Sequence, residues 1–258
     1  MVTRLEYAPK GLIGVLTPQA NTTVEPELSI LAPVGVGLLT ARLTSTASTM
    51  QERLIAYGEG IDRCLEQFAN APVSVAAFAC TGASYLIDPA SEREMLSDIT
   101  KQRGIVVITA AQAVLDAFAA LGATRVGMIS PYGGALHDIG VRYWQESGLK
   151  VANVTQLKND ETAFHPIYAL AGASSAKALE EMAAQTPDAI VILGTGLPSL
   201  GQILAADATA AVPVLSPNLC LMWRCMTVLE GQSPSARNLM PWLTGTAWSD
   251  RYKARCLV

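Results

Sequence analysis

The loop at residues 78–84 brings a thiol, a hydroxyl and a glycine together directly after an apolar run, in the order Phe-Ala-Cys-Thr-Gly-Ala-Ser. Backbone N–H groups at a helix start favour a thiolate over a thiol, so Cys80 could act there as a nucleophile or a proton donor. The competing interpretation is a small buried hydrophobe, which describes most free cysteines. Cys64, Cys220 and Cys225 fall in predicted helices and Cys256 in the tail, so Cys80 is the strongest candidate for chemistry.

The same loop pattern occurs twice in the chain. Gly194-Thr195-Gly196 lies 114 residues after Cys80-Thr81-Gly82, again behind an apolar run but without a thiol. Leu16-Thr17-Pro18 is matched by Ile129-Ser130-Pro131 at nearly the same offset. Two matches in one register indicate an internal duplication. Ligands of open α/β sheets bind beyond the carboxyl ends of the strands, so all four loops should border one cleft between two related lobes.

The first of these loops carries residue types that bind anions. Asn21, Thr22 and Thr23 suit a helix N-cap, where side chains and free N–H groups can hold an anion. Spacing alone favours an ordinary capped helix, with Glu25 and Glu27 complementing its dipole. Both interpretations stay open at this point.

The third and fourth loops are rich in glycine. Tyr132 could donate a hydrogen bond to a carboxylate, with Gly133 and Gly134 supplying backbone amides, or the segment is a simple turn. The Gly194-Thr195-Gly196 loop lacks the lysine and the spacing of a phosphate-binding loop, so that function is discounted.

Apolar, strand-like runs alternate with amphipathic helical segments. The runs near residues 75, 107 and 190 are apolar throughout, which is typical of strands buried on both faces of a parallel sheet. This alternation predicts an α/β fold with right-handed crossovers. We expect strands at residues 12–16, 35–41, 73–79, 105–108, 125–129, 150–154, 189–193 and 212–215, and helices at 51–68, 110–121, 137–147, 174–184 and 219–229.

The duplication predicts two pseudosymmetric Rossmann-like lobes, each a parallel four-stranded sheet flanked by helices. We place the first lobe at residues 1–111 plus 216–258 and the second at residues 112–215. No Pro/Ser-rich linker separates them, so the lobes should pack closely, with the active site in the cleft between them. The tail from Gly231 onwards either covers this cleft or packs on a partner.

Composition excludes several classes of protein. The 258 residues are 50% hydrophobic and only 16% charged, which rules out intrinsic disorder. A net charge of −4 without a basic run makes nucleic acid and anionic membranes poor partners. No apolar stretch approaches the roughly 18–20 residues of a membrane span, and residues 1–10 contain no signal core. Five irregularly spaced cysteines indicate reduced thiols and a cytoplasmic location, and His137 and His165 form no zinc motif, so no metal is expected.

These motifs resemble the Asp/Glu racemase superfamily. The run Thr17-Pro-Gln-Ala-Asn21-Thr-Thr-Val-Glu25-Pro-Glu is most similar to its maleate cis–trans isomerase branch, of which the arylmalonate decarboxylases are close relatives. Ser130-Pro-Tyr132, Tyr143, Gly148 and the run Val214-Leu-Ser-Pro-Asn218 before Met222-Trp223 extend the resemblance over nearly the whole chain from Gly11 to the region of Leu229.

The resemblance implies an enzyme without cofactor or metal that acts on a small carboxylate, as a homo-oligomer. Racemases and maleate isomerases of this superfamily use two cysteines, whereas the decarboxylases keep only the second. Here the first position is Cys80 and the second is Gly194, which argues against two-thiol racemisation. The resemblance makes Cys80 and Thr195 the catalytic candidates, and its substrate-binding candidates are Asn21, Thr81, Gly82, Tyr132, Gly133, Asn159, Gly194, Gly196 and Asn218.

One-thiol chemistry leaves three functions open. In the favoured one, a Cys80 thiolate adds to a cis-enedioate, the new single bond rotates, and elimination gives the trans product. In an arylmalonate-type decarboxylation, Cys80 instead protonates the carbanion left by CO2. The remote alternative is a non-catalytic paralogue that binds a small molecule. A racemase of a free amino or hydroxy acid would need a base facing Cys80, where the sequence offers only Thr195.

Overall fold

The computed structural model describes residues 5–159, 165–207 and 212–256. Within these residues, two parallel four-stranded sheets have the orders β2-β1-β3-β4 and β6-β5-β7-β8. The first sheet consists of β1 (Gly11–Pro18), β2 (Val36–Leu43), β3 (Val73–Phe78) and β4 (Val106–Thr109). The second consists of β5 (Arg125–Ser130), β6 (Lys150–Gln156), β7 (Ala189–Ile192) and β8 (Val214–Leu215).

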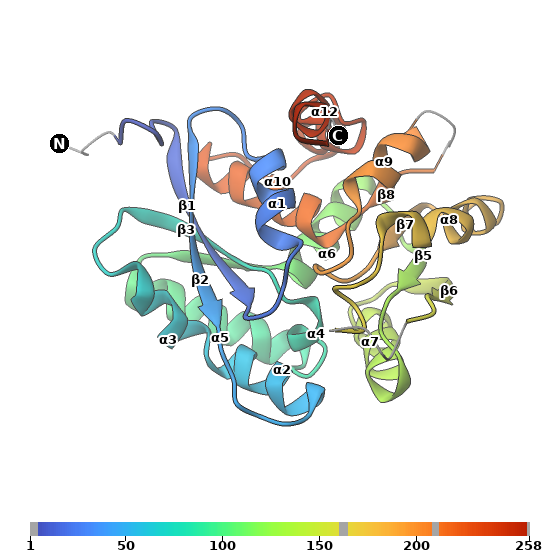
Figure 1. Ribbon diagram of the computed structural model, residues 1–258, viewed down its shortest axis with the longest axis horizontal. Coiled ribbons are helices and arrows are strands. Elements are labelled where there is room, and N and C mark those ends of the chain that lie inside the picture. Colours follow the sequence, from blue (N-terminus) through green and yellow to red (C-terminus); the bar gives the residue numbers. More distant parts are fainter. Residues whose placement is uncertain (1–4, 160–164, 208–211, 257–258) are drawn as a thin grey trace.

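The identical strand order of the two sheets confirms the duplicated α/β architecture. The blue and cyan strands of the first sheet lie to the left in Figure 1, and the second sheet lies to the right. All eight expected strands form, with ends displaced by no more than two residues. Strand β7 is buried along its whole length, as its unbroken apolar run predicts.

Helices flank both sheets. In the first half of the chain they are α1 (Val24–Leu31), α2 (Met50–Glu59), α3 (Ile61–Leu65), α4 (Thr81–Ser84), α5 (Pro89–Arg103) and α6 (Ala110–Leu121), with a 3₁₀ turn η1 (Glu66–Phe68). In the second half they are α7 (Gly134–Glu146), η2 (Gly172–Ser175), α8 (Ala176–Ala183), α9 (Leu200–Asp207), α10 (Pro217–Leu229), α11 (Ala236–Leu243) and α12 (Ser249–Cys256).

The chain returns to the first sheet after β8. Helix α10 packs against α1, β3 and β4 and also against α6, which in turn contacts α11. The division into lobes at residues 111/112 and 215/216 stays a prediction. Its first boundary falls within α6, and most of this helix, although assigned to the second lobe, packs on elements of the first. The lobes are closely packed, because one apolar core runs through both sheets.

Two sequence-based expectations about helices need correction. The helix expected over residues 51–68 is divided, because α2 ends at Gly60, α3 follows, and η1 completes the segment. Helices α5, α9, α11 and α12 were not expected. Helix α5 is largely solvated, so it lacks a broad apolar face; its signals are the Asp88 N-cap, Pro89 in the first turn and Gly104 in the left-handed conformation after its end.

The tail folds back on its own chain. Helix α12 lies against α1, and Arg251 donates to the carbonyl oxygens of Ile30 and Leu31 at the end of that helix. Trp248 is buried and donates from Nε1 to the Trp242 carbonyl oxygen at 2.7 Å. The tail also lies against α9, where Tyr252 faces Gly201 and Gly245 faces Leu204, so it packs on both halves of the chain.

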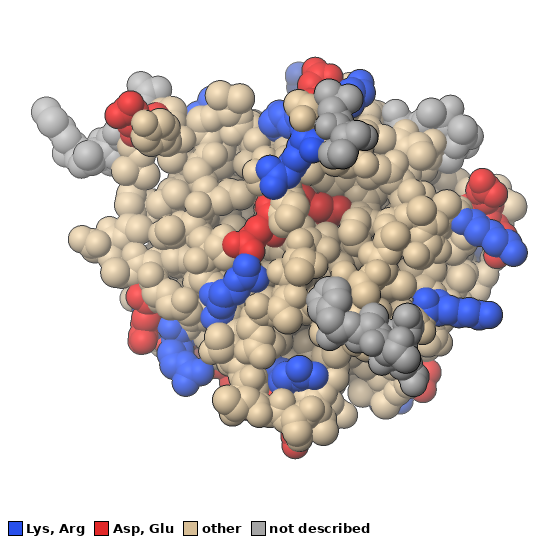
Figure 2. Space-filling model, viewed as in Figure 1, with Lys and Arg blue, Asp and Glu red and all other residues tan. Residues whose placement is uncertain are grey.

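The visible surface carries charges of both signs in small groups, separated by uncharged side chains (Figure 2). No helix in the described part of the chain has the length and apolar character needed to cross a membrane.

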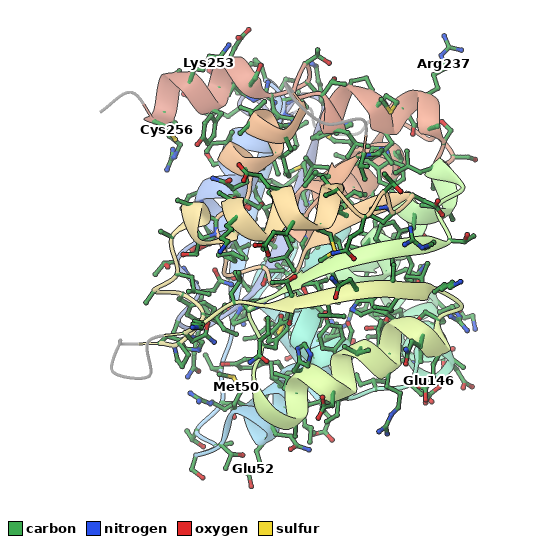
Figure 3. All side chains as sticks on the ribbon, turned by 90° about the vertical axis from the view of Figure 1, so that its right-hand side faces the viewer. Met50, Glu52, Glu146, Arg237, Lys253 and Cys256 are labelled. Atoms are coloured by element: carbon green, nitrogen blue, oxygen red, sulfur yellow. The ribbon has the colours of Figure 1, made fainter. Side chains whose placement is uncertain are left out.

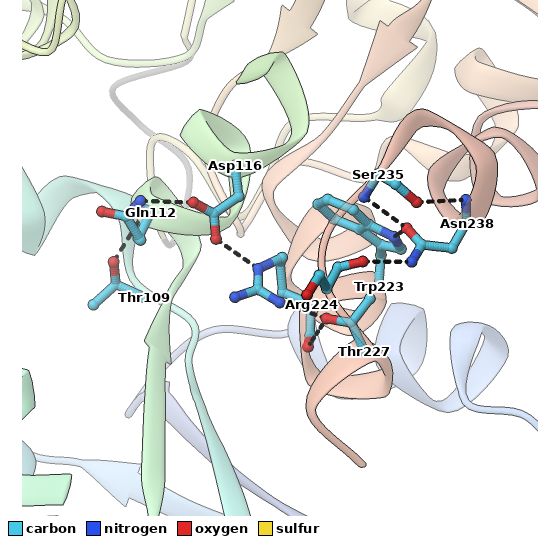
Figure 4. A network of polar contacts seen from close by, with 9 residues as sticks. Thr109, Gln112, Asp116, Trp223, Arg224, Thr227, Ser235 and Asn238 are labelled. Carbon is cyan, nitrogen blue, oxygen red and sulfur yellow. Dashed lines mark hydrogen bonds and ion pairs between the residues drawn. The ribbon is translucent and has the colours of Figure 1, made fainter. Parts of the chain in front are cut away.

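A largely buried ion pair joins α6 to α10. Arg224 contacts the Asp116 carboxylate, which also accepts a hydrogen bond from Gln112 Nε2 at 2.8 Å (Figure 4). Trp223, under the Arg224 guanidinium, donates from its indole to Asn238 at 3.1 Å, so the network continues into α11. Losing one partner of such a pair leaves an uncompensated charge out of water.

We expect R224M to lower the free energy of unfolding by about 3 kcal/mol, because Asp116 keeps its charge and loses its cation. Urea unfolding followed by circular dichroism measures this change. The double variant D116N/R224M, which removes both charges, should recover part of the loss. A double variant no more stable than R224M alone would contradict the interpretation.

Candidate active site

Cys80 lies at the junction of β3 and α4, at the carboxyl end of the first sheet. It is the N-cap residue of α4, and only 4% of its surface is exposed. The backbone N–H groups of Gly82 and Ala83 face its Sγ. Its place at a helix start is therefore as expected.

The Cys80 thiol is nevertheless not acidified. Burial raises the pKa of Cys80 to about 12, against the opposing effect of the Ala83 and Gly82 N–H groups. Burial outweighs the stabilisation of a thiolate at this helix start, because removing a charge from water costs more free energy than two N–H groups return. At neutral pH Cys80 carries its proton.

Four tyrosines surround this thiol. The rings of Tyr85 and Tyr132 meet edge to face with centroids 5.6 Å apart. Burial is the main cause that raises the pKa of each hydroxyl, and the Cys80 thiol adds to the rise for Tyr57, Tyr85, Tyr132 and Tyr168. The site therefore offers neutral hydroxyls, which can donate hydrogen bonds to an oxyanion.

The duplicated loops meet at Thr195. Its Oγ1 donates to the carbonyl oxygen of Ala79, the residue before Cys80, at 2.9 Å. Asn21 Nδ2 lies 3.4 Å from the same hydroxyl, and Thr23 Oγ1 donates to the Gly196 carbonyl oxygen at 2.8 Å. Loops from the two sheets are thus joined by buried hydrogen bonds. Thr195 is placed to hold the loops in register.

Gly194 occupies a position that admits no side chain. Its φ of +88° lies in the left-handed region, and a Cβ there would stand 2.6 Å from Pro131 Cγ. At the position that lacks the second thiol, the backbone therefore packs so closely against Pro131 that no side chain fits. At the neighbouring Gly196, a Cβ would meet the Tyr168 ring at 2.3 Å, so this turn also needs glycine.

The three asparagine candidates are already engaged through their amide groups. Asn21 Oδ1 accepts from the Thr23 and Val24 N–H groups at 2.8 and 3.0 Å, so it also caps the start of α1. Asn159 Nδ2 donates to the Pro131 carbonyl oxygen at 2.8 Å. Asn218 Nδ2 donates to the Thr195 carbonyl oxygen at 3.0 Å and to a carboxylate. They hold the loops as well as facing the site.

Several buried polar atoms have no hydrogen-bond partner among the described residues. They include the hydroxyls of Thr17 and Thr81 and the Oδ1 atoms of Asn159 and Asn218. Thr17 ends β1 beside β3, and Thr81 follows Cys80. An unpaired buried hydroxyl costs free energy, so the Thr17 and Thr81 hydroxyls are well suited to donate hydrogen bonds to a ligand's carboxylate.

A cavity of 360 Å³ opens beside Tyr132. Tyr132, Gly133 and Asn159 form part of its wall, and the other lining residues are mainly apolar: Met50, Leu86, Pro131, Leu136, Ile139 and Ile167, with Gln51, Gly134 and Pro166. The predicted candidates thus gather in two layers, with Cys80, Thr81, Gly82 and Thr195 buried between the lobes and Gly133 and Asn159 at the cavity.

Sequence reasoning missed some residues at this site. Thr17 was quoted only as part of a motif, although its match with Ser130 in the duplication marked it as a strand-end position. Arg53 was not considered; its charge lowers the pKa of His165 and opposes the burial-driven rise at Tyr57 and Tyr168, which places a cation by these rings. His165 stacks on Tyr168 with ring centroids 3.7 Å apart. No motif signals such contacts.

No metal-ligating cluster of three or more His, Cys, Asp or Glu side chains occurs in the described ranges. The described buried cysteines are free: Cys64 on α3, Cys80 at the start of α4, and Cys220 and Cys225 on α10.

The raised pKa of Cys80 predicts a steep pH dependence of alkylation. Only the thiolate reacts, so the iodoacetamide rate should rise roughly tenfold per pH unit from pH 7 to 10 without levelling off. A free cysteine, with a pKa of about 8.5, levels off within this range. Mass spectrometry of the Cys80 peptide measures the rate, and a plateau below pH 9 would show that the thiol is acidified after all.

The closed loop at Gly194 predicts intolerance of any side chain. G194A should lower the free energy of unfolding by about 2 kcal/mol, because the left-handed backbone and the Pro131 contact both oppose a Cβ. Thermal and urea unfolding measure this. G104A, at a left-handed glycine with nothing within 4 Å of the added Cβ, separates the backbone effect from the contact. Equal losses in both variants would mean that Pro131 is no obstacle.

The chain was compared with known proteins. A model of the arylmalonate decarboxylase family matches residues 13–239. A maleate isomerase of Pseudomonas putida is 25% identical over 233 residues, covering 84% of this chain and 91% of that protein. A maleate isomerase of Nocardia farcinica is 28% identical over 219 residues, covering 79% and 84%.

Solved structures show the same fold. A variant of the Nocardia farcinica maleate cis-trans isomerase superposes with a TM-score of 0.74 at 22% identity, covering 89% of this chain and 98% of that one. Arylmalonate decarboxylase superposes with a TM-score of 0.65 at 19% identity, covering 85% and 93%. Because the family model matches residues 13–239, which is most of the sequence, the chain belongs to the arylmalonate decarboxylase family.

Proposed function

We propose that this protein is a cofactor-independent enzyme that isomerises a small cis-dicarboxylate of the maleate type through the single thiol of Cys80. One contact carries the proposal. The Thr195 hydroxyl donates to the carbonyl oxygen before Cys80, so the thiol faces the duplicated loop across the interface between the sheets. Support also comes from the relatives of 25 and 28% identity, which are maleate isomerases.

The reaction begins with addition of sulfur to the double bond. Cys80 Sγ forms a bond to one alkene carbon, and the π electrons move into the adjacent carboxylate to give an enediolate. The thiol proton passes to an oxygen of that enediolate. This accommodates the raised pKa of Cys80, since no free thiolate has to persist. The Nocardia farcinica variant named above carries a covalently bound succinylcysteine intermediate, which supports the formation of a bond between a cysteine sulfur and a substrate carbon.

The reaction ends with rotation and elimination. The former double bond is now single and turns to the more stable trans arrangement. The enediolate electrons re-form the double bond, the carbon–sulfur bond breaks, and the proton returns to Sγ. No second thiol is needed, because the proton is kept on the substrate's own oxygen, and Gly194 leaves that face without an acid.

The surrounding residues stabilise the enediolate. The Tyr132 hydroxyl, the Thr81 hydroxyl and the Gly82 N–H are neutral donors in a site shielded from water, where such donors act most strongly. Gly133 and Asn159 border the outer cavity, where they can meet the second carboxylate. Thr195, Asn21 and Asn218 keep the two loops in place, with Gly194 and Gly196 providing the turn.

Arylmalonate-type decarboxylation is the second candidate, and two observations favour it. Cys80 is protonated at neutral pH, as a proton donor to a carbanion must be. The cavity beside Tyr132 is lined mainly by apolar side chains, including Leu86, Leu136 and Ile139, which would suit an aryl group. A non-catalytic binding protein is the remaining alternative.

We extend the proposal to the setting of the enzyme. Its free cysteines support a reducing, cytoplasmic location, and its substrate is a small carboxylate. The homo-oligomer that the resemblance implies remains part of this proposal.

Proton NMR in D2O with maleate or phenylmalonate as substrate tests these functions. Isomerisation by the route above gives fumarate without solvent deuterium at carbon, because the proton never leaves oxygen and sulfur. Decarboxylation of phenylmalonate instead places one deuterium on the α-carbon. We expect maleate conversion, and we expect C80S to lower kcat by at least roughly a thousandfold because it removes the nucleophile.

The matched control is C256S. Cys256 is an exposed thiol at the opposite end of the molecule from Met50, which lines the outer cavity (Figure 3). C256S should keep full activity. If C80S converts maleate as fast as the wild type, the single-thiol mechanism is wrong. If neither substrate is converted, the binding protein becomes the better interpretation.

A further inference from the structure

Glu27 is a buried carboxylate that the proposed chemistry does not use. It lies on α1, is 5% exposed, and has no cationic partner among the described ion pairs. Its place in the first turn of α1 is typical of an acidic residue that complements the dipole of its own helix. Its contacts lie elsewhere, on the loop that leads from Gly196 into α9 and on Asn218 of α10.

The carboxylate is held entirely by neutral donors. Oε1 accepts from the Ser199 and Leu200 N–H groups at 2.6 and 3.2 Å, so Glu27 caps the start of α9 from the first lobe. The Ser199 hydroxyl lies 3.1 and 3.2 Å from its two oxygens. Asn218 Nδ2 donates to Oε2 at 2.8 Å. Burial raises the pKa of Glu27, and these hydrogen bonds oppose the rise.

Asn218 carries this arrangement to the active site. Its Nδ2 donates both to Glu27 and to the Thr195 carbonyl oxygen, at 3.0 Å. The Thr195 hydroxyl in turn donates to the Ala79 carbonyl oxygen next to Cys80. A continuous set of buried hydrogen bonds therefore runs from Glu27 through Asn218 and Thr195 to the backbone that positions the thiol.

We propose that Glu27 is a positioning residue, which fixes the Asn218 amide so that it holds the Gly194–Ser199 loop against Cys80. The orientation of an Asn amide is decided by its neighbours. An ionised carboxylate at Glu27 accepts only, so Nδ2 must face it and Thr195, and Oδ1 is left facing away without a partner. This role rests on the proposed function for its effect on turnover, but the effect on Cys80 itself is independent of any substrate.

The variant E27Q tests the role with little change in shape. Its amide NH2 would oppose Asn218 Nδ2, so Asn218 must turn, and the Thr195 carbonyl oxygen loses its donor. We expect iodoacetamide to alkylate Cys80 roughly ten to a hundred times faster in E27Q, because the loop over the thiol opens more often. For maleate conversion we expect kcat to fall roughly tenfold or more, with KM little changed.

A double variant separates positioning from stability. In E27Q/N218D the amide and the carboxylate exchange places. The hydrogen bond between residues 27 and 218 is restored, but residue 27 is now the donor and residue 218 the acceptor. The Thr195 carbonyl oxygen then faces another acceptor. We expect the melting temperature to recover, while Cys80 alkylation stays fast and kcat stays low.

The control D188N neutralises a carboxylate that accepts backbone hydrogen bonds far from the site. Asp188 accepts from the Thr124 and Arg125 N–H groups at 2.9 and 2.8 Å, at the opposite end of the second sheet from the cleft. It should lower stability without speeding the alkylation of Cys80. Should E27Q fold poorly, S199A removes one donor and should change Cys80 alkylation in the same direction by a smaller factor.

Three results would overturn the role of Glu27. They are unchanged Cys80 alkylation in E27Q, equal acceleration in E27Q and D188N, or recovery of slow alkylation in E27Q/N218D together with its stability. Absence of maleate conversion by the wild type would instead refute the proposed function, and the alkylation rates would still decide whether Glu27 holds the loop.

Discussion

Exclusion of water between the two lobes is the constraint on which the site depends. Polar groups buried there must find partners within the protein or go unpaired at considerable cost. The loops satisfy each other across the interface: Thr23 with Gly196, Thr195 with Ala79, and Asn218 with both Thr195 and Glu27. The same dryness keeps Cys80 protonated and its neighbouring tyrosines neutral. The thiol and the tyrosine hydroxyls beside it are therefore uncharged, so the charge in the reaction comes with the substrate and is spread over hydroxyl and amide donors.

Duplication built this site, and divergence made it asymmetric. The two sheets share one strand order, and each delivers a Thr-Gly turn from its third strand in sequence. On one side the turn starts with a thiol at a helix N-cap. On the other it starts with a glycine in the left-handed conformation, packed under Pro131. The second turn therefore offers no thiol for the reaction. Its Thr195 hydroxyl instead donates a hydrogen bond to the Ala79 carbonyl oxygen and so holds the two loops together.

Much of the fold was predictable from sequence because the strand-like runs alternate with amphipathic helical segments. Unbroken apolar runs marked β3, β4 and β7, and the repeated strand-end loops indicated the duplication. Helix α5 was not predicted because it is stabilised by its caps and has only a narrow apolar edge. At the site, loop positions such as Cys80 and Thr195 were predictable, since a strand end fixes where a residue lies. The protonation of Cys80 was not, because it depends on burial. The contacts of Glu27 with α9 and α10 were not predictable either, since they join residues more than 170 positions apart.

The contact of α12 with α1 affects how the chain folds during synthesis. Arg251 holds the carbonyl end of α1 across a separation of 221 residues, and α10 completes the packing around β3 and β4. The second sheet lies between these pieces in the sequence, so it can assemble while the first lobe still lacks its closing helices. Contacts of such long range slow folding, and they leave α1 with an exposed apolar face until the C-terminus emerges. During synthesis, α1 is therefore exposed to aggregation or chaperone binding for longer than the strands of the second sheet, which pair with neighbours made soon after them.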